Sequence, residues 1–268
     1  MSHSTILEEI AEKTRLRVAR EKQATPLNII LERLEKIGKE EKKSDCPFPF
    51  EKALSAEGLS FICEVKKASP SKGVIAEDFP YLEIAKEYES AGAAAVSVLT
   101  EPEYFLGSDL YLKEIADAVH IPVLRKDFII DPYQIYEAKL LGAQAVLLIC
   151  ALLDTETLAS YIKTAEELGL SSLVEIHNEE EAKQALQVGS RVMGINNRDL
   201  KTFTVDLGVT ERLRKLIPKD IITVAESGIK SPDDIKFLAG VGIDAVLIGE
   251  SFMRAEDKAL FLHRLRRF

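Results

Sequence analysis

The sequence predicts a (β/α)8 barrel of the TIM-barrel class with a two-helix extension at its N-terminus. Three observations support this prediction. From about residue 60 onward, eight apolar runs of strand length alternate with segments long enough for one helix each. Four of those helical segments end on a glycine that comes shortly before the next apolar run. Eight strands that each lead into a crossover helix are typical of a closed parallel barrel.

The predicted strands are short apolar segments. They cover residues 61–65, 94–99, 121–124, 145–149, 172–175, 192–195, 221–225 and 245–248. The segments between them carry signals for the start of a helix. Asp131 and Ser231 each place a capping side chain before a proline at the first helical position, and Asn178 with Glu181 has the spacing of a capping box. The glycines expected just after helix ends are Gly92, Gly142, Gly189 and Gly242.

Two further helices are predicted ahead of the barrel, because apolar residues recur there at helical spacing on either side of Pro26. These are Ile6, Leu7, Ile10, Thr14 and Val18, then Leu27, Ile30, Leu31, Leu34 and Ile37. A charged run over residues 38–45 then leads to a segment, 46–50, that we expect to pack on the barrel. We therefore predict one domain over residues 1–268, with residues 1–45 as a helical extension and linker within it.

Composition excludes several classes of protein. The net charge of −9 argues against a general binder of nucleic acid or anionic membranes, although a local cationic pocket is compatible with it. The three cysteines form no CxxC pair, which favours a reducing cytoplasm over a disulfide framework or a zinc site. The longest apolar run, residues 145–153, is too short to cross a bilayer of roughly 30 Å. We expect neither export nor a membrane anchor.

Charged residues follow five of the predicted strands, at the end where barrel enzymes place their active sites. Glu64 and Lys66 lie two positions apart, so both are expected to point into the barrel mouth. The other charged or polar strand ends are Arg125-Lys126-Asp127, Glu175, Asn196-Asn197-Arg198 and Glu226. Any single carboxylate here is as readily half of a structural ion pair, but five such strand ends together favour a proton-transfer site. Within it we expect neighbouring charges to bring a lysine pKa toward neutrality.

A phosphate-binding side of the mouth is predicted where the last two strands end in glycine. Gly228 and Gly249 leave backbone N–H groups accessible, and Ser251 begins a short helical stretch after the eighth strand. Loops in this position form the usual phosphate site of such barrels. The loop 69–73 follows Lys66 and offers hydroxyl groups over the same mouth.

These stretches resemble the indole-3-glycerol phosphate synthase family. The segment EVKKASPSKG at residues 64–73 is similar to the first-strand signature of that family, and LRKDF at 124–128 is equally specific. Further similar segments follow in family order: LTEPEYFLGS at 99–108, VEIH at 174–177, GINNRDL at 194–200 and AESGI at 225–229. The resemblance spans the whole chain and is loosest in residues 2–43.

The resemblance implies a step of tryptophan biosynthesis, in which 1-(2-carboxyphenylamino)-1-deoxyribulose 5-phosphate closes to indole-3-glycerol phosphate with loss of carbon dioxide and water. It implies acid and base catalysis with no cofactor and no metal. By position, Lys126 resembles the general acid, and Lys66 the lysine that contacts the anthranilate carboxylate or helps dehydration. Glu64 and Glu175 are the alternatives for the final base.

The remaining positions that resemble family site residues fall into two groups. The substrate-binding group is Asn196, Arg198, Glu226, Ser227, Phe105, Phe128, Leu147 and Leu200. The phosphate-binding group is Ser69, Gly228, Gly249, Glu250 and Ser251, with Glu250 acting through its backbone N–H. The expected partner is a small phosphorylated substrate, with no nucleic acid or membrane partner, and the expected assembly is a monomer or weak homo-oligomer.

Two alternatives remain. A phosphate-binding barrel lyase that forms a Schiff base on Lys126 or Lys66 would also place a lysine at a strand end. A barrel without activity, acting as a binding or structural subunit, is disfavoured because both lysines and all three glutamates are present.

Overall fold

A closed barrel of eight parallel strands forms the centre of the computed structural model, which describes residues 5–40 and 47–267. The strands follow one another around the barrel in the order β1-β10-β9-β8-β7-β6-β5-β4, which confirms the predicted architecture. They are β1 (Ser60–Val65), β4 (Ala95–Leu99), β5 (Val123–Lys126), β6 (Ala145–Ile149), β7 (Ser171–Ile176), β8 (Val192–Asn196), β9 (Ile222–Glu226) and β10 (Ala245–Ile248). Strand β5 runs two residues beyond its predicted end, so Lys126 is its last residue.

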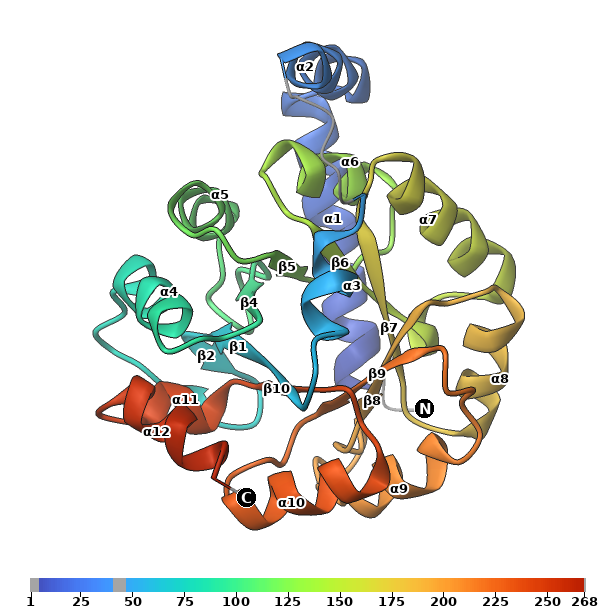
Figure 1. Ribbon diagram of the computed structural model, residues 1–268. Helices are drawn as coiled ribbons and strands as arrows, with labels where there is room; N and C mark the ends of the chain where they lie inside the picture. Colours follow the sequence, from blue (N-terminus) through green and yellow to red (C-terminus); the bar gives the residue numbers. More distant parts are fainter. Residues whose placement is uncertain (1–4, 41–46, 268) are drawn as a thin grey trace.

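Helices surround the barrel in a ring (Figure 1). They are α4 (Tyr81–Ser90), α5 (Asp109–Ala118), α6 (Tyr133–Leu140), α7 (Thr155–Glu167), α8 (Glu179–Gln187), α9 (Gly208–Arg214), α10 (Pro232–Val241), α11 (Glu250–Arg254) and α12 (Lys258–Leu265), with a 3-10 turn, η1, over Cys150–Leu152. The hairpin of β2 (Ala68–Ser69) and β3 (Gly73–Val74) follows β1.

The predicted helix signals are largely confirmed. Ser231 caps α10 with a full capping box, and the Asn178 side chain accepts a hydrogen bond from the backbone N–H of Glu181 at the start of α8. The four glycines predicted after helices all have positive φ, as a C′ position requires: 89° at residues 92 and 142, 75° at 189 and 84° at 242. The prediction at Pro132 is wrong by one position, because α6 begins at Tyr133 and Pro132 is its N-cap.

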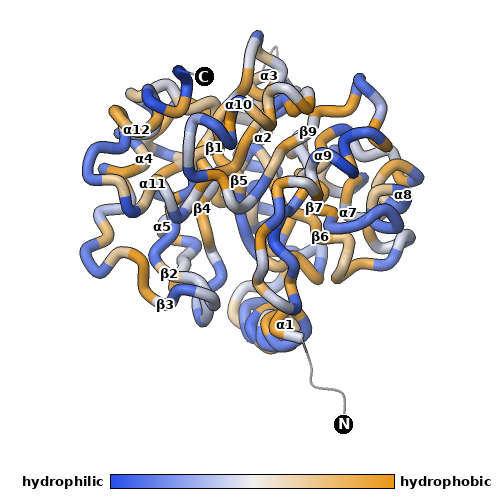
Figure 2. The backbone as a smooth tube through the Cα atoms, turned by 90° about the horizontal axis from the view of Figure 1, so that it is seen from below, coloured by the Kyte–Doolittle hydropathy of each residue, from blue (hydrophilic) through white to orange (hydrophobic). Residues whose placement is uncertain are grey.

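Two apolar layers hold the barrel together. One lies between the strands and the surrounding helices, and the other fills the barrel interior with side chains such as Ile62, Leu124 and Leu173. Figure 2 shows the strands as predominantly apolar and the outer helices as mixed. Helix α3 (Pro49–Leu54) contributes Phe50 and Leu54 to the interior layer and closes one end of the barrel. The segment after residue 46 therefore packs on the barrel as predicted.

The two N-terminal helices are present as predicted: α1 (Ile6–Ala24) and α2 (Leu27–Glu40). Viewed along the barrel axis, α3 lies in front of the barrel and α1 behind it, while α2 projects to one side (Figure 1). Helix α2 packs on α6 through Ile30, whereas Leu31 remains 39% exposed, so the buried face of α2 is narrower than its spacing predicted. No helix within residues 5–40 and 47–267 is long and apolar enough to span a membrane.

Two of the three cysteines can be located. Cys63 and Cys150 are buried and free. Cys46 lies outside the described residues, as does the predicted linker beyond residue 40.

Candidate active site

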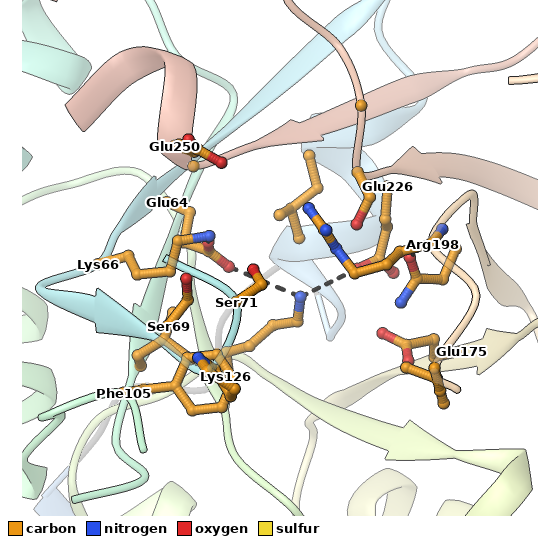
Figure 3. Close-up of a pocket in the computed structure, with 18 of the residues that line it drawn as sticks. Glu64, Lys66, Ser69, Ser71, Phe105, Lys126, Glu175, Arg198, Glu226 and Glu250 are labelled. Atoms are coloured by element: carbon orange, nitrogen blue, oxygen red, sulfur yellow. Dashed lines mark hydrogen bonds and ion pairs between the residues drawn. The ribbon is translucent and has the colours of Figure 1, made fainter. Parts of the chain in front are cut away.

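One cavity of about 420 Å³ opens at the carboxyl ends of the barrel strands (Figure 3). Every residue predicted for the site lines it. From the strand ends and the loops after them come Glu64, Lys66, Ser69, Phe105, Lys126, Phe128, Leu147, Glu175, Asn196, Arg198, Leu200, Glu226, Ser227, Gly228, Gly249, Glu250 and Ser251. Sequence segments up to about 190 residues apart therefore meet at one mouth, as the strand count required.

Lys126 is the centre of a charged cluster in this cavity. Its Nζ lies 3.0 Å from Oε2 of Glu226 and 3.6 Å from Oε2 of Glu64. The other oxygen of Glu64, Oε1, lies 2.6 Å from Nζ of Lys66. Glu64 thus bridges the two lysines, and all four side chains are mostly buried.

The electrostatics of this cluster contradict the expectation of a lysine with a pKa near neutrality. Burial alone would lower the pKa of Lys126, but the negative charges of Glu226, Glu64 and Glu175 outweigh it and raise that pKa above its ordinary value. The carboxylates surround the ammonium group and stabilise its charged form. Lys126 is therefore a protonated, hydrogen-bonding cation in the unliganded protein.

The glutamates divide into two electrostatic classes. The pKa of Glu64 is lowered, because Lys66 and Lys126 overcome the effect of its burial. The pKa of Glu175 falls to about 2 through His177, Lys126 and Asn196, again against its burial. Glu226 behaves in the opposite way: burial, together with the charges of Glu175 and Glu64, raises its pKa to about 7 despite Lys126. Glu226 is thus the carboxyl group of the cluster that titrates near neutrality.

Two glycines make room for this cluster. A Cβ at Gly249 would lie 2.1 Å from Oε1 of Glu64 and 2.9 Å from Nζ of Lys66. A Cβ at Gly194, on β8, would lie 2.2 Å from Oε1 of Glu226. Any larger residue at either position would displace a charged group of the site. Gly249 was predicted for its accessible backbone N–H, and the space it leaves for Glu64 is an additional role that the sequence alone did not indicate.

One rim of the cavity is polar and rich in loops. Ser69 lies in the β2–β3 hairpin, and Ser71 and Lys72 of the same hairpin also line the cavity. Ser227 and Gly228, which also line the cavity, both have positive φ, 67° and 83°, and turn the chain sharply after β9. A Cβ at Gly228 would lie 2.2 Å from a methyl carbon of Val205, so the turn also needs a residue without a side chain.

Two other rim residues have their side chains engaged within the protein. The hydroxyl of Ser251 donates a hydrogen bond to the backbone oxygen of Ile229 at 2.9 Å. The carboxylate of Glu250 accepts a hydrogen bond from Nε of Arg254 at 3.1 Å. Glu250 can therefore meet an anion through its backbone N–H while its own charge is partly neutralised by Arg254.

Apolar side chains form another part of the cavity lining. The rings of Phe105 and Phe128 lie with centroids 6.0 Å apart, and Leu147 and Leu200 line the same cavity. Three residues of α1, Ile6, Leu7 and Ile10, also line it. The sequence predicted α1 but did not predict that α1 reaches the mouth. The apolar residues of such a helix have the same spacing whether the helix packs on another helix or across the end of a barrel.

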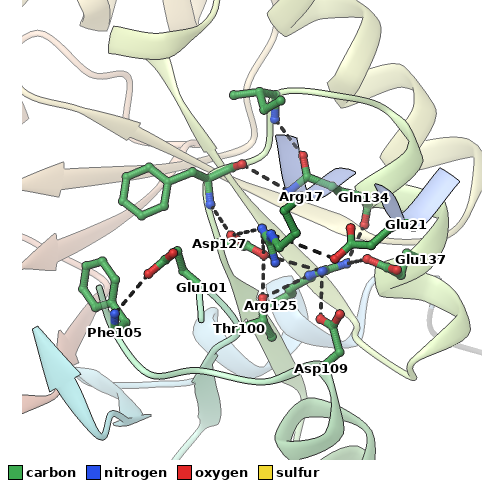
Figure 4. A network of polar contacts seen from close by, with 12 residues as sticks. Arg17, Glu21, Thr100, Glu101, Phe105, Asp109, Arg125, Asp127, Gln134 and Glu137 are labelled. Carbon is green, nitrogen blue, oxygen red and sulfur yellow. Dashed lines mark hydrogen bonds and ion pairs between the residues drawn. The ribbon is translucent and has the colours of Figure 1, made fainter. Parts of the chain in front are cut away.

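Three polar strand-end residues lie outside the charged cluster, although Asp127 also lines the cavity. Asn197 is buried and donates hydrogen bonds to the backbone oxygens of Glu226 and Ser227, so it supports the loop after β9. Arg125 and Asp127 flank Lys126, and their side chains point outward from the barrel (Figure 4). The guanidinium of Arg17 on α1 donates to both oxygens of Asp127 at 2.8 Å.

Arg125 is buried completely in that outer network. Its Nη2 lies 2.8 Å from Oδ1 of Asp109, its Nη1 lies 2.8 Å from Oε2 of Glu137, and its Nε donates to the hydroxyl of Thr100 at 3.2 Å. The network joins α1, α5 and α6 to the strand that carries Lys126 (Figure 4). Its role is to hold the end of β5 in place.

Comparison with known proteins identifies relatives over nearly the full chain. A family model described as "Indole-3-glycerol phosphate synthase" matches residues 7–265. An indole-3-glycerol phosphate synthase from Ruminiclostridium cellulolyticum is 56% identical over 261 residues, covering 97% of this chain and 98% of the relative. One from Endomicrobium trichonymphae is 52% identical over 264 residues, covering 97% and 99%.

Solved structures with low sequence identity share the fold alone. The 3-hexulose-6-phosphate synthase from Salmonella typhimurium has a TM-score of 0.63 at 18% identity and covers 77% of this chain and 96% of its own. The thiamine phosphate pyrophosphorylase from Pyrococcus furiosus has a TM-score of 0.60 at 16% identity, covering 81% and 96%.

Proposed function

The chain belongs to the indole-3-glycerol phosphate synthase family, and from this premise we propose how its residues divide the work of the reaction. The activity is that of a carboxy-lyase. It closes 1-(2-carboxyphenylamino)-1-deoxyribulose 5-phosphate to indole-3-glycerol phosphate, with loss of carbon dioxide and water, in tryptophan biosynthesis.

Lys126 is the general acid of this proposal. The observation that carries the assignment is the position of its ammonium group inside the cavity, between Glu226 and Glu64. As the aromatic ring carbon attacks the ketone, negative charge develops on the ketone oxygen, and a cationic donor beside it stabilises that charge and delivers the proton. Lys66, paired with Glu64, meets the substrate carboxylate and assists departure of the hydroxyl group.

Glu175 is the base that removes the last ring-side proton. Both oxygens of Glu64 already face a lysine, which suits Glu64 to positioning those lysines. Glu175 is ionised because its pKa lies at about 2, and it lines the cavity, so it can accept a proton from bound substrate. The sugar-derived chain of the substrate contacts Glu226, Asn196, Arg198 and Ser227.

The cavity lining offers apolar side chains for the aromatic ring of the substrate and a polar rim for its phosphate. The aromatic ring rests on Phe105, Phe128, Leu147 and Leu200, where burial of apolar surface favours it. The phosphate lies at the polar rim formed by Ser69, Gly228, Gly249, Glu250 and Ser251. Lys72 and Lys230 also line the cavity and add positive charge near that rim.

We propose a cellular compartment and a class of partner for the enzyme from its cysteines and its net charge. The buried free thiols of Cys63 and Cys150 support a reducing cytoplasm. The net charge of −9 supports a small-molecule partner and disfavours nucleic acid. We propose a monomer or weak homo-oligomer.

The activity is tested by mixing the purified protein with the carboxyphenylamino-deoxyribulose phosphate, without added metal or cofactor, and following indole fluorescence. The chain contains no Trp, so its own background is low. We expect a rate that saturates with substrate. Folded protein that binds the compound without turnover would instead support a binding barrel.

A Schiff-base mechanism is separated from acid catalysis by borohydride trapping. Imine formation needs a neutral amine, whereas the pKa of Lys126 is raised and Lys66 is paired with Glu64. We expect no covalent adduct after reduction in the presence of substrate. A mass increase on either lysine would support the lyase alternative.

A further inference from the structure

His177 lies directly behind one of the glutamates of the site. It is the first residue after β7, and its Nε2 lies 3.2 Å from Oε1 of Glu175. Both side chains are largely buried, with 12% and 6% of their surface exposed. Among the described residues, those that line the cavity include Glu175 but not His177. His177 therefore meets Glu175 from outside the cavity.

The imidazole is itself held from the other side by α8. Its Nδ1 lies 3.0 Å from Oε2 of Glu181, and the same oxygen accepts a hydrogen bond from the backbone N–H of His177 at 2.8 Å. The other oxygen of Glu181 accepts from Nδ2 of Asn178, the N-cap of α8, at 2.7 Å. The first turn of α8 thus fixes the position of the ring that faces Glu175.

Both ring nitrogens lie close to a carboxylate, which favours a proton on each and a positive charge on the ring. Nδ1 is hydrogen-bonded to Glu181, whereas Nε2 meets Oε1 of Glu175 as an ion-pair contact without hydrogen-bond geometry. Burial opposes this charge, but Glu175 and Glu181 raise the pKa of His177 to about 10. The other polar groups that act on Glu175 are Lys126 from β5 and Asn196 from β8, and Glu175 in turn acts on Glu226 of β9. The backbone oxygen of Glu181 also faces the thiol of Cys150 at 3.8 Å.

We propose that His177 is a positioning residue for Glu175: the ring held between Glu175 and Glu181 fixes the orientation of the Glu175 carboxylate toward the cavity and keeps it ionised. The proposal rests on the role of Glu175 as base in the proposed function. Without His177, Glu175 would be a buried carboxylate beside Glu226, and the lysine shared with Glu226 would be its nearest cation. A carboxylate in that position takes up a proton more readily and is free to rotate toward Lys126.

The test compares wild-type protein with His177→Gln and His177→Ala. Glutamine retains much of the volume and an N–H donor but not the charge. We expect both variants to slow a single turnover, with alanine losing up to about 100-fold, as misplacement of a reacting group by an ångström can cost, and glutamine recovering part of the loss. We expect KM to change much less than the turnover rate.

The second readout is the titration of Glu175 itself, followed through its carboxyl resonance in protein labelled with ¹³C at glutamate Cδ and assigned with Glu175→Gln. In wild type we expect the carboxylate to stay ionised well below the usual pH range of a glutamate, because its pKa is lowered. In His177→Gln the midpoint moves upward. The same midpoint in both proteins, or single-turnover rates within twofold of wild type in both variants, would overturn the proposal.

Controls separate this proposal from the one on which it rests. His120→Ala removes an exposed histidine at the opposite end of β5 and leaves both readouts unchanged. If Glu175→Gln keeps the wild-type rate, the assignment of Glu175 as base fails, whereas the carboxyl titration still tests the contact with His177. If Glu175→Gln is inactive and the His177 variants are not, only the positioning role fails. Thermal unfolding verifies that each variant is folded, and His177→Gln decides the question if His177→Ala does not fold.

Discussion

Nζ of Lys126 and Oε2 of Glu226 meet at 3.0 Å across the barrel mouth, although 100 positions separate them in the chain. Glycine at position 194 on the neighbouring strand β8 leaves the space in which the other oxygen of Glu226 lies. Three strands thus contribute to one contact. The contact holds the lysine as a cation, while burial and the charges of Glu175 and Glu64 raise the pKa of Glu226 to about 7 despite that lysine.

Replacing Lys126 with alanine removes the proposed acid and leaves Glu226 and Glu64 without a shared cation. We expect single-turnover and steady-state rates to fall by at least about 100-fold, the contribution typical of a general acid. Lys163→Ala is the matched control, because that side chain is 77% exposed on α7 and should leave the rate unchanged. A Lys126→Ala enzyme with undiminished turnover would contradict the assignment.

Gly249→Ala tests the steric role of a glycine in the charged cluster. A methyl group there would lie 2.1 Å from Oε1 of Glu64, so Glu64 must move and its contact with Lys66 must change. We expect a folded protein with turnover reduced by at least about tenfold, since Glu64 places both lysines. The control is Gly240→Ala on α10, where no atom lies within 4 Å of the added group, and helix propensity predicts a gain of up to about 1 kcal/mol in the free energy of unfolding. Equal turnover in both variants would show that Glu64 can shift without cost.

The barrel and the site could be predicted because both depend on short-range patterns in the sequence. Apolar runs and helix-ending glycines mark the strands, and charged residues after those runs fall at one end of the barrel by topology alone. The period of two along β5 also implies that Arg125 and Asp127 point away from the side that Lys126 faces, so their outward position was open to prediction. The direction in which the pKa of Lys126 shifts could not be predicted, because it depends on distances to Glu226 and Glu64 that only the folded chain sets.

Arg125→Met tests the outer network that holds the end of β5. The change leaves Asp127 and Glu137 buried with one cation fewer, and loss of one partner of a buried ion pair typically costs about 3–5 kcal/mol in the free energy of unfolding. Urea denaturation of the variant and of wild type at neutral pH measures the difference. Arg212→Ala is the control, since its pair with Asp206 is more than 60% exposed on both sides and should contribute less than about 1 kcal/mol. A loss for Arg125→Met as small as the control would show that the carboxylates find other partners.

Glu21 on α1 gives a pH-dependent test of the same region. One of its oxygens, Oε2, is buried and has no hydrogen-bond partner among the described residues, and burial together with the charges of Glu137 and Asp109 raises the pKa of Glu21 to about 7, against the effect of Arg17. In the unfolded chain the pKa is near its ordinary value of 4.5, so ionisation destabilises the folded state increasingly as pH rises from about 4.5 to about 7.

Glu21→Gln removes the charge of this carboxylate. We expect its thermal midpoint to exceed that of wild type at pH 8 by about 2–4 °C for each kcal/mol relieved, and to match wild type at pH 4, where Glu21 is protonated in both states. Glu12→Gln, on the exposed face of the same helix, should show no such dependence. If the difference in thermal midpoint between Glu21→Gln and wild type is the same at pH 4 and pH 8, ionisation of Glu21 does not destabilise the folded state.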